Sequence, residues 1–380
     1  MTIGAFVRSA AAAATLLIAA SAALGGEIIK FSLFDGETVE GRLSLPAAQA
    51  KIRTLVIYVH GTGPSTYLNR RGTKQFAFNY FDHFADEFNK RGIAFFSYNK
   101  RGMGLAEEPP FETVDRVKFK RVVPSVEVRD LATFIKSLRS DKRLKKARVI
   151  LLGWSEGTIL AAMAAEDRRN KIHALFLAGY VHDNMTEVIK WQNSGGSAMV
   201  NLRAAFDADK DGTISRAEYE STEKNVADYR TRRLQNARFE QIDIDKDDAI
   251  TIKDFGLIQA PRYKLITDAI AKGDEEWIWK NYFRVSIDWL REHDKLEANR
   301  TRLLRLKLPI YVFHGESDAN CRSDAVAELR ASFDRAGKRN LSEFVFPGHD
   351  HDLNFAEWIT KKTISPGITR MFATADQLNR

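Results

Sequence analysis

The sequence has a single cysteine, Cys321, among its 380 residues. An internal disulfide is therefore excluded, so stability outside the cytoplasm has to come from the hydrophobic core, from oligomerisation or from a bound metal. Lys and Arg exceed Asp and Glu by 58 to 50, but they lie in short runs without interleaved aromatic residues. No nucleic-acid motif is present, and we expect no nucleic-acid partner.

The sequence also lacks an apolar run long enough for a comfortable membrane span. Arg8 is the only charged residue in the first 25, and an alanine-rich stretch follows it and ends in small residues near Ala22. This order is typical of a secretory signal peptide, and no cysteine nearby could carry a lipid. We expect a signal peptide in residues 1–25 that is cleaved after Ala22 or after Gly25, export to the periplasm or the medium, and no stable membrane insertion afterwards.

Apolar runs alternate with helical patterns along the rest of the chain. Continuous runs such as 54–59 are typical of strands buried on both faces, whereas apolar residues three or four positions apart, as in 81–88, favour helices. Such alternation predicts an α/β fold with a mostly parallel sheet covered by helices on both faces. Eight strands are expected, at residues 28–33, 38–45, 54–59, 93–98, 149–154, 173–179, 309–315 and 341–346, and the first two form a hairpin around Asp35-Gly36.

A long segment separates the sixth expected strand from the seventh. Residues 183–302 far exceed the length that one connecting helix requires, so an insertion must fill this gap. Its aromatic and charged composition favours helices that lie over the edge of the sheet. We therefore predict a core formed by residues 26–182 and 303–380, with a helical cap formed by residues 183–302.

The insertion contains a twelve-residue acidic loop that runs from Asp207 to Glu218. Gly212 stands at the sixth position, where the loop needs a sharp turn. Calcium takes about six to eight oxygen ligands, and the spacing of this loop supplies them. The expected ligands are the carboxylates of Asp207, Asp209, Asp211 and Glu218, the backbone carbonyl of Thr213 and, through a water molecule, Ser215.

A second acidic loop, from Asp243 to Asp254, repeats this pattern imperfectly. Asp248 replaces the glycine, and Asp254 is one methylene shorter than the glutamate expected at the last position. Asp tolerates a positive φ better than most residues, but the shorter reach predicts weak calcium binding or a site that has lost its metal. Ile214 and Ile250 are expected to pair as a bridge between the loops. The corresponding ligand positions are Asp243, Asp245, Asp247, Ala249, Thr251 and Asp254.

A serine between two glycines follows the expected strand 149–154. Gly153 and Gly157 allow the strand and the next helix to cross closely, so that Ser155 sits strained and exposed at the start of the helix. This pattern is typical of a nucleophile elbow. The alternative is an ordinary turn between a strand and a helix. The residues that follow the other strands distinguish a nucleophile elbow from such a turn.

A serine hydroxyl needs a base to take its proton and an acid to orient that base. His351, on the loop after the last strand, is the expected base, with His349 as a close rival. Asp318, after the seventh strand, is the expected acid. The alternative is that Asp318 only stabilises a turn or caps a helix. His60 is expected to shape its own loop through hydrogen bonds. The order serine, acid, histidine is that of hydrolases with a nucleophile elbow.

The chain resembles the α/β-hydrolase superfamily over about residues 30–182 and 303–365, because it carries several motifs of that superfamily in the same order. The motifs are His60-Gly61-Thr62-Gly63, Lys100-Arg101-Gly102-Met103-Gly104, Gly153-Trp154-Ser155-Glu156-Gly157, His314-Gly315 with Asp318, and His351. The resemblance implies Ser155 as nucleophile, Asp318 as acid and His351 as base. It also implies an oxyanion hole made by the backbone amides of Thr62 and Glu156.

Within this superfamily the chain is most similar to bacterial serine esterases and to aminopeptidase-like hydrolases. The two acidic loops resemble a paired EF-hand unit, which is unusual in a cap, so the substrate cannot be transferred from relatives. A serine at the elbow, in place of aspartate, argues against dehalogenase and epoxide-hydrolase chemistry.

Two classes of function follow from these features. The first is an exported serine hydrolase that cleaves a carboxylic ester or a related acyl bond of a small-molecule substrate, beneath a calcium-binding cap. An aminopeptidase or acyltransferase that uses the same chemistry is a variant of it. The second is a calcium-responsive binding protein on a hydrolase scaffold that has no catalytic activity.

Overall fold

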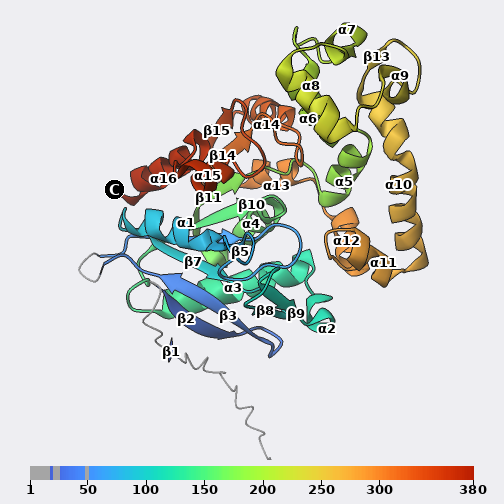
Figure 1. Ribbon diagram of the computed structural model, residues 1–380. Coiled ribbons are helices and arrows are strands. Elements are labelled where there is room, and N and C mark those ends of the chain that lie inside the picture. Colours follow the sequence, from blue (N-terminus) through green and yellow to red (C-terminus); the bar gives the residue numbers. More distant parts are fainter. Residues whose placement is uncertain (1–17, 20–25, 48–50) are drawn as a thin grey trace, which may run out of the picture.

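A computed structural model describes residues 18–19, 26–47 and 51–380 (Figure 1). Most of the expected signal peptide, with both of its cleavage positions, lies outside the described residues. The short strand β1 (Ile18–Ala19) pairs with the next strand of the chain in antiparallel fashion. The cleavage of residues 1–25 therefore stays a prediction.

The sheet contains all eight strands expected from the sequence, and β1 extends it at one edge. The order in the sheet is β1-β2-β3-β7-β4-β10-β11-β14-β15. The eight strands are β2 (Glu27–Ser32), β3 (Thr38–Ser44), β4 (Thr54–Val59), β7 (Ala94–Tyr98), β10 (Arg148–Trp154), β11 (Ile172–Ala178), β14 (Ile310–Gly315) and β15 (Leu341–Phe346). The prediction of an α/β fold with a mostly parallel eight-stranded sheet is confirmed.

Strand direction brings the candidate residues to one edge of the sheet. β2 and β3 form the expected hairpin, and β3 also runs antiparallel to β7, whereas β7, β4, β10, β11, β14 and β15 are mutually parallel. The carboxyl ends of parallel strands lie at the same edge of a sheet. Thr62 follows β4, Ser155 follows β10, Asp318 follows β14 and His351 follows β15, so these four residues lie at that edge.

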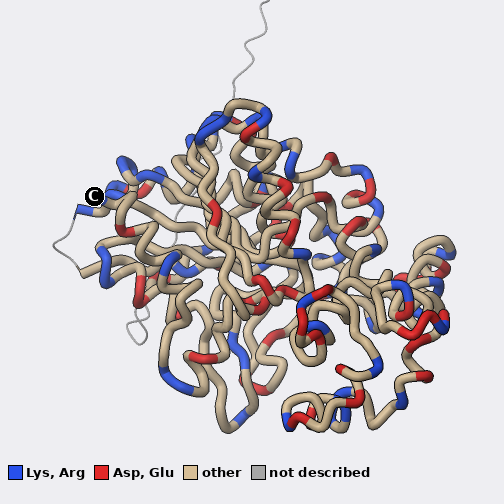
Figure 2. Tube along the Cα trace, turned by 90° about the horizontal axis from the view of Figure 1, so that it is seen from above, with Lys and Arg blue, Asp and Glu red and all other residues tan. Residues whose placement is uncertain are grey.

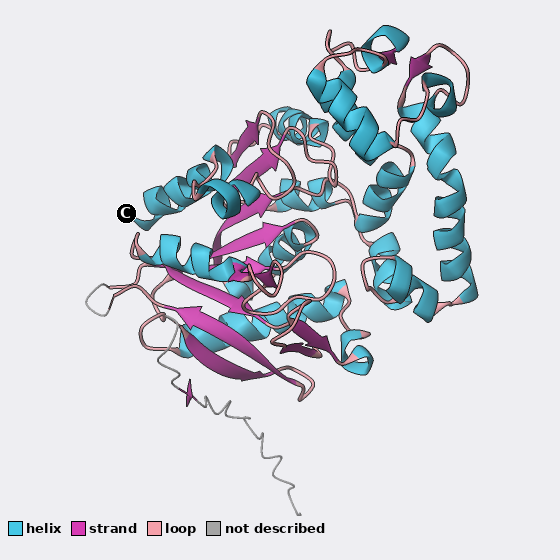
Figure 3. Ribbon diagram, viewed as in Figure 1, coloured by secondary structure: helices cyan, strands magenta, loops and turns pink. Residues whose placement is uncertain are grey.

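Helices cover both faces of the sheet, as Figure 3 shows. On one face, α1 (Tyr80–Asn89) and α16 (Pro366–Asn379) bury their aromatic side chains against the sheet. On the other face lie α3 (Pro124–Ser140), α4 (Gly157–Glu166) and α14 (Asp324–Arg335). Each face therefore has its own apolar cluster, and the central strands β4, β7, β10 and β11 between them are buried on both sides.

Nine helices lie between β11 and β14, and the first eight of them form the insertion, which extends away from the sheet in Figure 1. The two acidic loops lie near its far end, while α11 and α12 lie closer to the core. The helices are α5 (Met185–Asn193), α6 (Gly196–Phe206), α7 (Arg216–Tyr219), α8 (Lys224–Leu234), α9 (Phe239–Ile242), α10 (Ile252–Lys272), α11 (Glu275–Asn281) and α12 (Ile287–Lys295).

The two ends of the insertion lie side by side and form a neck. The backbone N–H of Asn299 donates to the carbonyl of Asp183 at 3.1 Å, and that of Arg300 donates to the carbonyl of His182 at 2.8 Å. The next helix, α13 (Asn299–Arg305), places Leu303 in the apolar cluster of the core. The predicted division between cap and core after residue 302 falls inside this helix, and the exact domain limits stay a prediction.

Two small hairpins lie outside the main sheet, where the sequence pattern predicted no strands. One is formed by β5 (Arg70–Arg71) and β6 (Phe78–Asn79). The other is formed by β8 (Met103–Leu105) and β9 (Glu112–Val114), and the short helix α2 (Arg116–Phe119) follows it. The first hairpin contributes to the site described below.

The net charge of +8 is not gathered on one face. In the view of Figure 2, Lys and Arg residues are distributed around the molecule with Asp and Glu residues between them. Within the described ranges, no helix is both long enough and apolar enough to cross a membrane. The expected absence of a nucleic-acid partner stays a prediction.

Candidate active site

Ser155 lies in a strained turn between β10 and α4. Its φ is 57°, in the left-handed region that residues other than glycine rarely adopt. A Cβ atom at position 153 would lie 2.3 Å from the carbonyl oxygen of Gly157, and one at position 157 would lie 2.1 Å from the carbonyl oxygen of Val59. Both glycines are therefore required by close backbone approach, as the sequence pattern predicted, and the turn projects Ser155 at the sheet edge.

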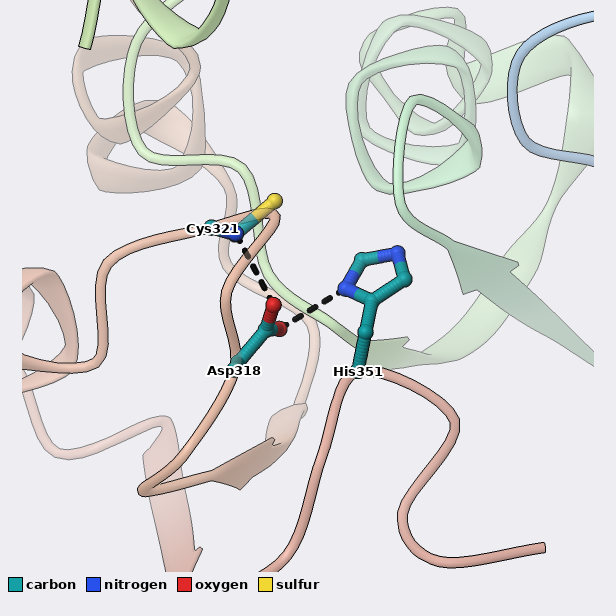
Figure 4. A group of neighbouring side chains, drawn as sticks. All are labelled: Asp318, Cys321 and His351. Carbon is teal, nitrogen blue, oxygen red and sulfur yellow. Dashed lines mark hydrogen bonds and ion pairs between the residues drawn. The ribbon is translucent and has the colours of Figure 1, made fainter. Parts of the chain in front are cut away.

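Asp318 and His351 are in direct contact (Figure 4). The Nδ1 atom of His351 lies 2.8 Å from Oδ2 of Asp318, which is fully buried. The other oxygen of Asp318 accepts hydrogen bonds from the backbone N–H groups of Asn320, at 2.8 Å, and Cys321, at 2.9 Å. The carboxylate is thus held from one side by the backbone and presents its second oxygen to the imidazole.

Opposite charges shift the pKa values of this pair in opposite directions. Burial alone raises the pKa of the Asp318 carboxyl, but the charge and hydrogen bond of His351 bring it below its ordinary value. Burial lowers the pKa of His351, yet the charge of Asp318 raises it above the ordinary value of 6.5. The pair therefore favours an ionised carboxylate that stabilises a protonated imidazole.

The rival histidine, His349, is directed away from this pair. Its Nδ1 donates to the carbonyl of Pro347 at 2.9 Å, and its Nε2 accepts from the backbone N–H of Gly367 at 3.3 Å. Its ring packs against Phe346, with ring centroids 5.3 Å apart. Both ring nitrogens of His349 are thus engaged in the C-terminal part of the fold, whereas His351 is the histidine that contacts Asp318.

A third histidine, His314, lies beside Asp318 and carried no predicted role of its own. Its Nδ1 accepts from the backbone N–H of Tyr180 at 2.9 Å, and its Nε2 therefore donates to the carbonyl of Cys321 at 3.1 Å. Because Nδ1 accepts a hydrogen bond, this ring is neutral, and burial lowers its pKa. Its Nε2 lies 3.5 Å from Oδ2 of Asp318 and places a second ring against that carboxylate.

The loop after β4 is held by buried polar contacts. His60 donates from Nε2 to the carbonyl of Tyr98 at 2.7 Å, and burial lowers its pKa to about 3. The ammonium group of Lys100 donates to the carbonyl of Gly61 at 2.7 Å. Within residues 18–19, 26–47 and 51–380, the backbone N–H groups of Thr62 and Glu156 have no hydrogen-bond acceptor. These two N–H groups are available to a ligand.

The side chain of Glu156 connects the serine turn to the cap. It is fully buried, and its Oε1 accepts hydrogen bonds from Nε1 of Trp289, at 2.7 Å, and from Nε2 of His293, at 2.8 Å. Burial raises the pKa of Glu156, but the donors and the positive charge of Lys100 bring it below its ordinary value. The sequence offered no sign of this contact, because the partners lie more than 130 positions further along the chain.

A cavity of about 290 Å³ lies in front of Ser155, between the core and the cap. Thr62 and His351 line it from the core, and Met185 and Tyr282 line it from the cap. The predicted nucleophile, base and oxyanion-loop residue therefore meet around one space, with Asp318 behind the base. The remaining lining residues are Tyr58, His60, Gly61, Pro64, Ser65, Asn69, Arg71, Trp154, Val188, Gln192, Phe283, Asn320, Cys321 and Asp352.

The first acidic loop brings three carboxylates together. One oxygen each of Asp207, Asp209 and Glu218 lies within 4.8 Å of the others. Glu218 accepts from the backbone N–H of Ala208 at 2.8 Å, and Asp207 accepts from that of Gly212 at 3.0 Å. Oδ1 of Asp207 is buried and has no hydrogen-bond partner among the described residues. A buried acceptor in a ring of carboxylates fits a hard cation.

The second acidic loop adopts the same backbone course. Asp248 has a φ of 64° where Gly212 has 89°, so aspartate takes the left-handed conformation required at this position. The bridge between Ile214 and Ile250 is present, as predicted. One oxygen each of Asp243, Asp245 and Asp254 lies within 4.8 Å of the others, and the ammonium group of Lys253 lies 2.6 Å from Asp245.

Comparisons with known proteins bear on the fold. A family model described as "alpha/beta hydrolase fold" matches residues 54–357. The structure is similar to acylaminoacyl peptidase from Pyrococcus horikoshii, with a TM-score of 0.51 and 13% sequence identity over 93% of this chain and 40% of that chain. A comparison with the sequences of curated proteins finds no significant match.

Two esterases with solved structures also align with the chain. A thermostable carboxyl esterase from Bacillus coagulans has a TM-score of 0.49 and 14% identity, over 94% of this chain and 100% of that chain. An esterase from Exiguobacterium antarcticum has a TM-score of 0.45 and 12% identity, over 92% of this chain and 98% of that chain.

Proposed function

The protein belongs to the alpha/beta hydrolase fold family, because the model of that family matches residues 54–357. Starting from this membership, we propose that the protein is a serine hydrolase. It cleaves a carboxylic ester or a related acyl bond. The observation that carries this proposal is the strained Ser155, which shares a cavity with His351, while His351 is bonded at 2.8 Å to the buried Asp318. A strained serine, a base and an oriented acid are the groups that acyl transfer requires.

The proposed reaction proceeds in two steps. The hydroxyl oxygen of Ser155 attacks the substrate carbonyl while Nε2 of His351 takes the hydroxyl proton, and Asp318 stabilises the imidazolium that forms. His351 then gives this proton to the leaving group, which departs and leaves an acyl-enzyme on Ser155. In the second step, water attacks the acyl-enzyme with His351 again as base, which releases the acid and restores the serine.

The free backbone N–H groups support a role as the oxyanion hole. We assign this role to Thr62 and Glu156, whose N–H groups lie on the two loops that border Ser155 and have no other acceptor in the described part of the chain. Preorganised donors of this kind stabilise the negative oxygen of the tetrahedral intermediate. The complete set of nucleophile, base, acid and donors favours an enzyme over a catalytically silent binding protein on the same scaffold.

We also propose that the two acidic loops form a paired EF-hand unit that binds calcium. In the first loop, Asp207, Asp209, Asp211, Thr213, Ser215 and Glu218 would hold the ion. The buried, unpartnered oxygen of Asp207 supports this assignment. The second loop offers Asp243, Asp245, Asp247, Ala249, Thr251 and Asp254, but Asp254 is shorter than glutamate and Lys253 competes for Asp245. We therefore propose weaker binding there.

The apolar run of residues 10–20 supports export as part of the proposal. The mature protein would then work in the periplasm or the medium. Calcium is more abundant outside the cytoplasm, and extracellular calcium sites of modest affinity suffice there. Expression of the full chain followed by N-terminal sequencing of the exported protein tests this, with cleavage after Ala22 or Gly25 as the expected result.

The test of the hydrolase proposal is labelling with a serine-reactive fluorophosphonate. We expect the wild-type protein to be labelled and the Ser155→Ala variant to remain unlabelled, with both samples showing the same circular dichroism spectrum. Labelling that persists in Ser155→Ala, or a folded wild-type protein that stays unlabelled with and without calcium, would contradict the proposal. A panel of p-nitrophenyl esters and aminoacyl anilides then separates an esterase from an aminopeptidase.

A further inference from the structure

One wall of the Ser155 cavity is formed by Asn69 and Arg71, at the start of the hairpin β5–β6. Neither residue takes part in the acyl-transfer chemistry proposed above. A cavity of about 290 Å³ is suited to a small substrate, and a charged side chain in its wall selects among such substrates by their charge. The geometry of these two side chains indicates which charge is selected.

The guanidinium group of Arg71 is held in place from two sides. Its central carbon lies 4.0 Å from the ring centroid of Tyr80, which is fully buried. Its Nη1 lies 3.2 Å from Oδ2 of Asp352, the residue after His351. This single contact with a half-exposed carboxylate engages Nη1 alone, whereas a strong Arg–carboxylate pair uses two shorter hydrogen bonds, so the guanidinium keeps donor capacity for a second carboxylate.

Asn69 is equally constrained. Its φ is 46°, and its backbone N–H donates to the carbonyl of Thr66 while its carbonyl accepts from the N–H of Tyr80, both at 3.2 Å. Its Oδ1 faces Nε of Arg71 at 3.5 Å, which turns its amide nitrogen the other way. Asn adopts the left-handed region more readily than most residues, and these contacts hold its side chain at the cavity wall.

Both side chains keep donors that no acceptor in the described ranges takes up. In the part of the chain that the structure describes, Nδ2 of Asn69 and Nη2 of Arg71 have no hydrogen-bond acceptor. The carboxylate of Asp318 is occupied by His351 and by backbone N–H groups, and that of Asp352 faces Arg71. Among the described residues, Asp352 is thus the one carboxylate that contacts the guanidinium of Arg71, and it does so through Nη1 alone.

We propose that Arg71 and Asn69 form a subsite for a carboxylate carried by the substrate, so that the enzyme acts on small acyl compounds with a free carboxylate, such as half-esters of short dicarboxylic acids. This inference rests on the hydrolase proposal above. The planar guanidinium matches a carboxylate in shape and charge, and the amide of Asn69 adds a neutral donor. An apolar acyl chain of the same length makes no hydrogen bond with either donor.

The test compares two esters of four-carbon acids, p-nitrophenyl butyrate and the p-nitrophenyl half-ester of succinate, which differ only in a terminal methyl or carboxylate. We expect the wild-type enzyme to prefer the half-ester. In Arg71→Gln, the ratio of kcat/KM for the half-ester to that for butyrate should fall at least about tenfold, since a hydrogen bond to a charged group is lost.

Arg70→Gln is the matched control. Arg70 is the neighbouring residue on the same strand, but its guanidinium lies over Phe111, at 4.7 Å from the ring centroid, and does not line the cavity. We expect the ratio in this variant to equal that of the wild type. If Arg71→Gln does not fold, Arg71→Lys keeps the charge, loses the planar fork and should still lower the ratio.

Two outcomes would contradict the carboxylate subsite and leave the hydrolase proposal unaffected. They are a wild-type enzyme that prefers butyrate, and an Arg71 variant whose ratio matches that of Arg70→Gln. The rate of fluorophosphonate labelling in the presence of succinate tests the subsite without any substrate turnover. Succinate should slow the labelling of the wild type more than the labelling of Arg71→Gln. If the folded wild type is neither labelled nor active on either ester, the hydrolase proposal itself fails, which separates the two cases.

Discussion

Trp289, in helix α12 of the cap, donates a hydrogen bond of 2.7 Å from its indole nitrogen to the carboxylate of Glu156, the residue next to Ser155. His293 donates to the same oxygen from one turn further along the helix. Trp289, Glu156 and His293 are all buried. The position of α12 and the position of the backbone N–H of Glu156 are therefore linked, and this N–H is a proposed oxyanion donor.

Removal of the indole N–H should lower kcat. Loss of an oxyanion donor costs about 100- to 1000-fold in kcat, and here the donor stays but is held less firmly, so we expect a fall of about tenfold in Trp289→Phe. Trp277→Phe removes an indole N–H from α11, at the edge of the same apolar cluster, and should leave kcat near the wild-type value. Equal kcat values in the two variants, measured with one ester, would count against the link.

The contact between Asp318 and His351 predicts the acidic limb of the pH profile. His351 accepts the serine proton only when neutral, so kcat/KM should fall as pH decreases through its pKa, with a midpoint above the ordinary value of 6.5. Asp318→Asn removes the charge that raises this pKa, which should move the midpoint to lower pH and reduce kcat by roughly 1000- to 10,000-fold. Measurement of kcat/KM against pH for the wild type and for Asp318→Asn, with one ester, tests this prediction. A midpoint that does not shift in the variant would contradict it.

Replacement of the two neighbouring histidines should separate their roles. His351→Ala removes the proposed base and should abolish measurable turnover. His349→Ala removes hydrogen bonds to Pro347 and Gly367, so it should lower the free energy of unfolding by about 1–2 kcal/mol and leave turnover intact. Ester hydrolysis and denaturant unfolding of both variants measure these effects. Inactive His349→Ala with active His351→Ala would reverse the assignment.

Chelation should destabilise the protein through the first acidic loop. A ligand that binds only the folded state adds roughly 2.7 kcal/mol of stability at a concentration 100 times its Kd, so EDTA should lower the Tm and added calcium should restore it. Asp207→Ala should remove most of this difference. Asp228→Ala, on α8 outside both loops, serves as the control and should keep the difference. A Tm that EDTA does not change in the wild type would argue against a stabilising calcium site.

Local sequence patterns were sufficient for the sheet and for the strained turn. Continuous apolar runs located the inner parallel strands, because strands buried on both faces need such runs, and alternation of apolar and polar residues around Asp35-Gly36 located the hairpin of β2 and β3. Gly153 and Gly157 indicated the turn at Ser155, since their spacing reflects a backbone contact that no side chain can enter. The order of Asp318 and His351 after later strands was readable because parallel strands end at the same edge.

Contacts between segments far apart in the chain could not be predicted from local sequence patterns. The bond between Glu156 and Trp289 depends on how α12 packs over the core, and nothing in the residues around either one indicates it. The hairpin that carries Arg71 consists of two strands of two residues each, which is too short for a periodic pattern. His349 and His351 became distinguishable only through the hydrogen bonds of their rings.

The neck of the insertion has a consequence for how this molecule can evolve. Because the chain leaves and rejoins the core at two hydrogen-bonded segments, 182–183 and 299–300, a module of any length that begins and ends there leaves the strand register unchanged. Recombination at the neck can thus exchange the cap without shifting the strands that precede Asp318 and His351, as long as the new module supplies donors for the buried carboxylate of Glu156. The core and the cap can in this sense change separately, with the contact through Glu156 as the point at which they have to remain matched.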